Sequence, residues 1–284
     1  MNYENSLVIF FRVIECRIFL PLARKEALEM TGYVRNIVNN QDVIPDSILI
    51  KGATILSMDE SVGNIERGDI LISGSTITAI GENLEANGAR IINATNIIAM
   101  PGMVDSHRHS WEGQLRRINP NATCLEDYSN ATHFSFAKYY RPADMYIGNL
   151  LTALGCIDAG ITTVIDNSHN SRTAAHSDAA VEALLDAGIR AIHASGAPVS
   201  GEWDKAHWPG NWQRLQEKYF KDNPESLVSL AVMAQLEPAL WAEARRLELP
   251  IVTEFFGSFM ASELESLHRR GLLGPDNIFN HCTS

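Results

Sequence analysis

The stretch PGMVDSHRH, residues 101–109, marks the point where the sequence passes from one structural pattern to another. Before it, from Asp46 onward, short apolar runs with period-two alternation are separated by glycines, which is typical of strands joined by turns. After it, apolar strand-length runs alternate with amphipathic helix-length segments, which indicates βα units and a parallel sheet. The sequence therefore predicts a small β-module followed by an α/β domain.

The α/β part contains six predicted strands, over residues 103–109, 161–166, 189–194, 227–233, 250–254 and 277–281. Helices are predicted between them near residues 143–159, 173–187, 211–220, 238–247 and 258–270. Six consecutive units favour a TIM-type (β/α) barrel over a doubly wound open sheet. A complete barrel of eight units takes about 250 residues, so we expect an incomplete barrel of about six βα units in a truncated chain.

Three parts of the chain follow from these patterns. Residues 1–46 are expected to form a helical extension, because their apolar positions follow amphipathic helical spacing. Residues 47–102 are expected to form a small β-sandwich module, and residues 103–284 the partial barrel.

Composition excludes several classes of protein. The chain has 284 residues, of which 45% are hydrophobic and 20% charged, as in ordinary globular proteins. Its net charge of -11 argues against nucleic acid as a partner. The apolar segment 6–23 is interrupted by Arg12, Glu15 and Arg17, which argues against a membrane span and a signal peptide.

The cysteines indicate a reducing compartment. The four residues show neither C-x-x-C spacing nor the density of a secreted disulfide scaffold. They are Cys16, Cys124, Cys156 and Cys282. We therefore expect a cytoplasmic protein.

His107 and His109 form the sharpest local signal. Residues two apart in a strand point to the same face, so both imidazoles can approach one metal ion. An isolated H-x-H pair is more often coincidental than functional. This pair, however, ends the first predicted barrel strand, the face on which barrel enzymes carry their active sites. The position favours a metal site.

Residues 101–109 resemble the amidohydrolase superfamily, and most nearly its aminohydrolase branch of cytosine-deaminase-like and triazine-hydrolase-like enzymes. Gly113 and Arg116 downstream extend the likeness. Residues 158–166, DAGITTVID, are similar to the family's second-strand segment, and residues 279–282, FNHC, to its sixth-strand histidine.

The resemblance, which runs from about residue 48 to residue 284, implies a metal-dependent hydrolase of non-peptide carbon–nitrogen bonds. Within that class we expect hydrolytic deamination of a small polar or heterocyclic compound. The alternative is a truncated, non-catalytic relative: a fragment, a pseudogene product or a binding protein.

The resemblance also implies a set of site residues. His107 and His109 would bind the metal, and His281 would position water or substrate or serve as a further ligand. Glu254 stands where the family has a fifth-strand histidine. It is expected to be a ligand and a catalytic carboxylate with His281, the alternative being a rim glutamate paired with an arginine.

One divalent ion is expected, because no lysine in residues 227–233 can form the carboxylated bridge of two-metal members. Zinc is the first choice, and a carboxylate ligand leaves iron or manganese as alternatives. The family's eighth-strand aspartate, which handles the proton, lies beyond the expected six units.

Substrate contacts are expected from His169, Trp111 and Arg116, which follow the first two barrel strands. Each has an alternative as an ordinary loop or helix residue. Asp105 shares the strand face of His107 and His109 and is expected either to orient an imidazole or to be a structural strand-end residue. The partner is a small molecule, and the open edges of six strands predict a homo-oligomer.

Overall fold

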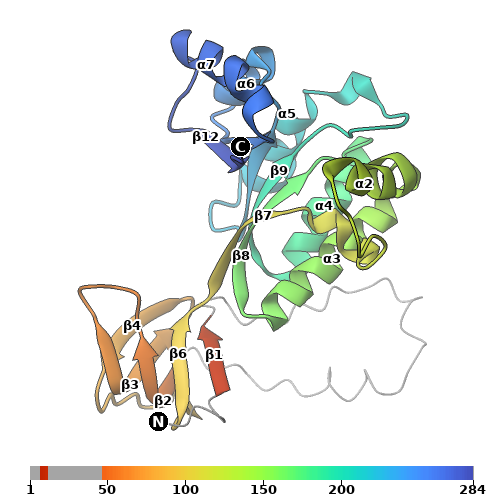
Figure 1. The fold of residues 1–284 in the computed structure, drawn as a ribbon. Helices are drawn as coiled ribbons and strands as arrows, with labels where there is room; N and C mark the ends of the chain where they lie inside the picture. Colours follow the sequence, from red (N-terminus) through yellow and green to blue (C-terminus); the bar gives the residue numbers. More distant parts are fainter. Residues whose placement is uncertain (1–6, 12–46, 284) are drawn as a thin grey trace, which may run out of the picture. The chain divides into compact units, whose positions relative to one another are not determined.

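The computed structural model describes residues 7–11 and 47–283 (Figure 1). Contacts divide the chain into two compact units, with the boundary in the sequence between Met103 and Val104. Each unit is described by itself.

The first unit is a β-rich module, as predicted. Its strands are β1 (Leu7–Phe11), β2 (Ser47–Leu56), β3 (Asn64–Ser73), β4 (Thr76–Gly81), β5 (Arg90–Asn93) and β6 (Ile97–Pro101). They form one sheet in the order β1-β6-β2-β3-β4, with β5 also paired to β2. The sheet branches at β2, whose first half pairs with β5 and whose second half pairs with β6. Buried isoleucines, among them Ile50, Ile55 and Ile70, form its core.

The helical prediction for residues 1–46 is wrong over residues 7–11, which form strand β1. This strand pairs in parallel with β6, from Leu7 opposite Ile97 to Phe11 opposite Pro101. The sequence LVIFF consists of residues with high strand propensity, and a partner strand stabilises that preference over a helix. The rest of the predicted helical extension, and with it most of the apolar segment 6–23, lies outside the described residues.

The second unit is the predicted incomplete barrel. Six strands follow one another in the sheet: β7 (Met103–Arg108), β8 (Ile161–Ser168), β9 (Arg190–Ser195), β10 (Val228–Met233), β11 (Ile251–Phe255) and β12 (Asn277–His281). The pairs from β8 to β12 are parallel. The sheet curves into a nearly closed barrel, in which Nδ2 of Asn280 on β12 donates a hydrogen bond of 3.1 Å to Oδ1 of Asn167 on β8.

The main helices lie between these strands, where the sequence predicts them. They are α3 (Pro142–Asp158), α4 (Ala174–Ala187), α5 (Asn211–Leu215), α6 (Pro238–Arg246) and α7 (Ala261–Arg269). The predicted helix 211–220 continues after α5 as the π-helix η5 (Gln216–Phe220), and the predicted helix 258–270 begins with the 3₁₀ helix η6 (Ser258–Met260). Buried residues such as Trp212, Trp241 and Ile251 pack between helices and sheet.

The connection between β7 and α3 is the longest excursion in the barrel unit. It contains η1 (Ser110–Leu115), α2 (Leu125–Ala131), η2 (Thr132–Phe136) and η3 (Ala137–Tyr139). A shorter 3₁₀ helix, η4 (Lys205–His207), follows β9. In the described part of the chain, none of the helices combines the length and the apolar character needed to cross a membrane.

Candidate metal centre

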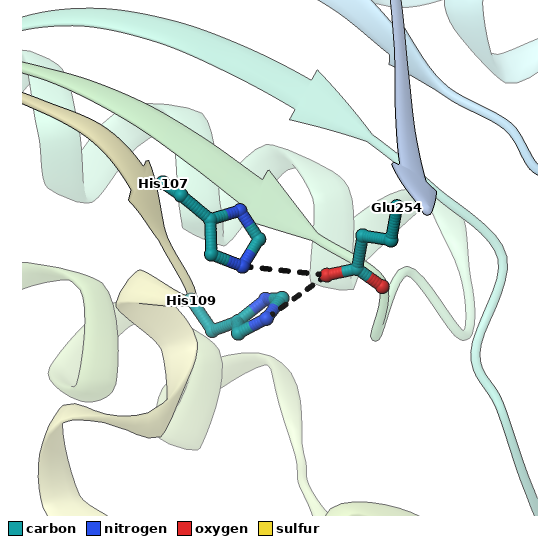
Figure 2. Close-up of side chains that lie close together, drawn as sticks. All are labelled: His107, His109 and Glu254. Carbon is teal, nitrogen blue, oxygen red and sulfur yellow. Dashed lines mark ion pairs between the residues drawn. The ribbon is translucent and has the colours of Figure 1, made fainter. Parts of the chain in front are cut away.

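Two strand ends of the barrel bring three potential metal ligands together. His107 lies on β7, His109 directly after it, and Glu254 on β11 (Figure 2). The Nε2 atom of His107 lies 3.6 Å from Oε1 of Glu254, and Nε2 of His109 lies 3.1 Å from the same oxygen. One ligand atom from each residue falls within 4.8 Å of the others. The arrangement can hold one metal ion.

His281 joins this group from the end of β12. Its Nε2 atom lies 3.9 Å from Oε1 of Glu254, and its ring centroid lies 4.4 Å from that of His107. Its ring also stacks on that of Phe256, with 5.0 Å between the ring centroids. The four residues predicted as metal or catalytic groups are therefore brought together at the carboxyl-terminal ends of the strands.

The charges of the group differ between the two neighbouring histidines. Burial lowers the pKa of His107 to about 4. Burial acts the same way on His109, but its contact with the Glu254 carboxylate outweighs it and raises the pKa to about 8. Burial raises the pKa of Glu254, and the His109 contact outweighs this too, so the pKa is lowered. At neutral pH Glu254 is a carboxylate next to His109.

The donor set fits a divalent metal ion. Oε1 of Glu254 is buried and accepts no hydrogen bond in the described structure, although three imidazole Nε2 atoms lie within 3.9 Å of it. The ion pair with His109 at 3.1 Å balances its charge, but a buried carboxylate oxygen that accepts no hydrogen bond is still costly. Imidazole nitrogen and carboxylate oxygen are both ligands that zinc accepts. A cation between these atoms would satisfy all of them.

Asn167, which the sequence analysis did not identify, contacts both histidines. Its backbone oxygen lies 2.9 Å from Nδ1 of His109, and its side-chain Nδ2 lies 2.7 Å from Nδ1 of His107. Asp105 was expected either to orient an imidazole or to be a structural strand-end residue, and its carboxylate accepts hydrogen bonds from the backbone N–H of His107 and the side chain of Arg108. Asp105 is thus a structural strand-end residue.

Asp166, next to Asn167 on β8, holds the backbone that follows the histidines. Its Oδ1 accepts a hydrogen bond of 3.0 Å from the backbone N–H of Ser110, and its Oδ2 lies 2.8 Å from Nδ1 of His193. The side chains of Asp166 and His193 are fully buried. The strand pairing places these two residues opposite each other, so the pair is built into β8 and β9.

A cavity of about 700 Å³ is lined by the three candidate metal ligands and by His169, one of the predicted substrate contacts. Trp111 does not line it, because its side chain is fully buried behind the wall, with its ring centroid 5.6 Å from that of His169. Arg116 lines a second cavity of about 660 Å³, which shares His107 and His109 with the first. Of the three predicted substrate residues, only His169 reaches the main cavity.

The excursion after β7 supplies wall residues that the sequence analysis missed. His133 is buried, and its ring centroid lies 4.7 Å from that of His169. Burial lowers the pKa of His133 to about 4. The Tyr128 hydroxyl donates a hydrogen bond of 2.5 Å to Glu112, and both residues line the cavity. No strand or repeat pattern marks these residues in the sequence.

Comparison with known proteins identifies relatives over most of the chain. Over 259 residues the chain is 27% identical to the 5'-deoxyadenosine deaminase of Methanosarcina acetivorans, covering 83% of this chain and 57% of that protein. It is 29% identical over 251 residues to the 5-methylthioadenosine/S-adenosylhomocysteine deaminase of Carboxydothermus hydrogenoformans, covering 78% of this chain and 54% of that protein. The chain thus spans a little more than half the length of these relatives. No protein-family model matches the sequence.

Among solved structures, the fold is similar to an atrazine chlorohydrolase from Arthrobacter aurescens complexed with zinc and atraton. The TM-score is 0.68 at 22% sequence identity, over 82% of this chain and 60% of that one. The sequence relatives, which are named deaminases, and the shared fold both agree with the resemblance to the amidohydrolase superfamily predicted from the motifs.

Proposed function

We propose that the chain carries the metal centre of a hydrolase that deaminates a small nitrogen heterocycle. The observation that carries this proposal is the convergence of His107, His109 and Glu254 at the carboxyl-terminal ends of β7 and β11. The names of the sequence relatives, a 5'-deoxyadenosine deaminase and a 5-methylthioadenosine/S-adenosylhomocysteine deaminase, support deamination as the reaction.

His107, His109 and Glu254 would hold one divalent ion, with His281 beside them. Zinc is our first choice, because a similar structure contains zinc. Glu254 brings a negative charge that also suits iron or manganese. Such an ion lowers the pKa of water from 15.7 to about 7, which supplies a nucleophile at neutral pH.

The chain's own residues bind and orient the reactants. The His281 side chain is 34% exposed and faces the cavity, where its Nε2 can donate a hydrogen bond to water or to the substrate. The neighbouring Glu254 carboxylate is ionised and can accept a proton from the attacking water. These are the catalytic roles that we propose for His281 and Glu254.

The cavity favours an uncharged or cationic substrate without phosphate groups. Among the described residues that line it, none is lysine or arginine, whereas Glu112, Glu237 and Glu254 contribute carboxylates. Away from the metal position, a phosphate would meet no lysine or arginine side chain and would be repelled by these carboxylates. The remaining wall, with His169, Trp208 and other aromatic or apolar side chains, suits the faces of a heterocyclic ring.

The sheet edges, the net charge and the cysteines support proposals on oligomeric state, other partners and compartment. Each of the end strands β7 and β12 pairs on one side only, so these edges support self-association into a homo-oligomer. The net charge of -11 speaks against nucleic acid, and a membrane partner is not expected. Free thiols at Cys124, Cys156 and Cys282 suit the reducing cytoplasm.

Purified full-length chain, supplied with zinc and freed of excess metal, tests the proposal. We expect about one bound ion per chain by elemental analysis, and ammonia release from adenine nucleosides without phosphate. His107→Ala should lose both, whereas His268→Gln, at an exposed position on α7, should lose neither. Absence of bound metal and of ammonia from the wild-type chain would favour a non-catalytic relative.

A further inference from the structure

We propose that Asn167 is a positioning residue for both histidines, and that its side-chain amide presents its oxygen to His107 when metal is bound. This inference rests on the proposed metal centre. Asn167 is fully buried at the end of β8, between the ends of β7 and β12. It is therefore placed to fix two ligands at once.

For His109 the contact is made by the backbone. The carbonyl oxygen of Asn167 can only accept, so Nδ1 of His109, 2.9 Å away, must donate. This keeps a proton on Nδ1 and directs Nε2 to the metal position beside Glu254. A histidine ligand usually donates its second N–H to such an acceptor.

For His107 the contact has the opposite direction. Nδ2 of Asn167 can only donate, so Nδ1 of His107, 2.7 Å away, accepts. The neutral ring then carries its proton on Nε2, which faces Oε1 of Glu254 at 3.6 Å. In this tautomer Nε2 has no lone pair for a metal ion. The described arrangement therefore suits the metal-free site.

Metal binding through Nε2 requires the proton on Nδ1 and an acceptor opposite it. A half-turn of the Asn167 amide supplies Oδ1 to His107 with the heavy-atom positions nearly unchanged. Asn280, whose Nδ2 now donates to Oδ1 of Asn167, must turn as well and offer its oxygen. The two amides thus form a short hydrogen-bonded chain that can run in two directions. In one, Asn280 donates to Asn167 and Asn167 donates to His107; in the other, each of these hydrogen bonds is reversed, and metal binding selects this second direction.

Aspartate substitutions test the direction of this chain, because a carboxylate accepts and does not donate. Asn167→Asp should keep or tighten zinc binding, whereas Asn167→Leu should weaken it by about 10- to 100-fold, as for other residues that support metal ligands. Asn280→Asp also imposes the second direction and should keep or tighten binding. Asn170→Asp adds a similar charge at a buried neighbour that does not contact the histidines, and should not tighten it.

Zinc affinities are measured by competition with a chelator, and the visible spectrum of the Co²⁺-loaded chain reports the ligand geometry. On the wild-type chain, ¹H–¹⁵N spectra of the histidine rings with and without zinc need no variant: the proton of His107 should move from Nε2 to Nδ1. Wild-type zinc binding that Asn167→Leu leaves unchanged, or a His107 proton that stays in place, overturns this inference alone. Failure of the wild-type chain to bind zinc overturns the proposed function as well.

Discussion

The Nε2 atom of His109 lies 3.1 Å from Oε1 of Glu254, although the two residues belong to the first and fifth strand ends of the barrel sheet. The contact depends on the curvature of the sheet, which brings β11 around to face the end of β7. Glu254 is buried there, so its carboxylate has no access to bulk water to compensate its charge. His109, whose pKa this contact raises to about 8, balances the charge in the metal-free chain, and we propose that a metal ion does so when it is bound.

Substitution of Glu254 should change metal affinity and metal preference separately. Glu254→Ala removes the anionic ligand and should weaken zinc binding by more than about tenfold. Tenfold is the lower end of the loss in metal affinity found when a residue that only supports a ligand is replaced. Glu254→His supplies an imidazole instead and should keep zinc binding while reducing the relative affinity for Mn²⁺. Competition titrations with both metals measure the two effects. Equal zinc affinity of wild type and Glu254→Ala would remove Glu254 from the ligand set.

The stability of the metal-free chain should depend on His133 in acid. The pKa of His133 is lowered to about 4 by burial, from an ordinary value of 6.5. Below pH 6.5 the unfolded chain takes up a proton at this ring that the folded chain does not, so the free energy of unfolding falls until about pH 4. The contribution is up to about 3 kcal/mol.

Urea unfolding in the presence of a chelator, at several pH values between 7 and 4, measures this effect. His133→Gln should make the pH dependence shallower, because it removes the titrating ring. His268→Gln is the control, since His268 is exposed, and it should leave the slope as in the wild type. Identical slopes for wild type and His133→Gln would show that His133 does not contribute.

Asp166 should stabilise the fold through its two buried contacts. Asp166→Ala leaves the N–H of Ser110 and the ring of His193 without a partner, and should lower the free energy of unfolding by about 3–5 kcal/mol, as for other broken buried pairs. Asp158→Ala, at an exposed position on α3, should change it by about 0.5 kcal/mol or less. Denaturant titrations of the three proteins decide this. A small effect at Asp166 would mean that water replaces its contacts.

Local sequence pattern predicted most of the barrel, because βα units are built from short-range periodicity. Strand β12 was predicted at its observed bounds, and helices α3 and α4 within one residue. The strand at residues 7–11 was not predicted, because its backbone is stabilised by β6, ninety residues away in the chain. The strand propensity of LVIFF is a local signal, but nothing in the local sequence shows the partner strand that stabilises it.

The site shows the same difference between residues that local pattern reveals and residues that only tertiary contacts reveal. His107, His109, Glu254 and His281 could be selected in advance, since each stands at the end of a predicted strand and belongs to a residue type that binds metal. Asn167 also ends a strand, but an asparagine there carries no distinctive chemistry until its contacts with both histidines are known. Tyr128 and His133 lie in an excursion whose path over the cavity follows from tertiary packing alone.

Close packing of two glycines holds the segment after His109 against α3, and this contact should be sensitive to a single methyl group. A Cβ atom at Gly148 on α3 would overlap the backbone of Trp111, and one at Gly113 on η1 would overlap the carbonyl oxygen of Gly148. Gly148→Ala should therefore push η1 away from α3 and cost about 1–3 kcal/mol of stability.

Gly155→Ala is the matched control, because it lies on the same helix and an added Cβ meets no atom within 4 Å. It should stabilise the chain by about 0.5–1 kcal/mol through helix propensity alone. Since η1 begins directly after His109, Gly148→Ala should also weaken zinc binding, whereas Gly155→Ala should not. Thermal unfolding and zinc competition on both variants measure the two effects. Equal shifts in both variants would mean that helix propensity, and not the close approach to Trp111, determines the outcome at Gly148.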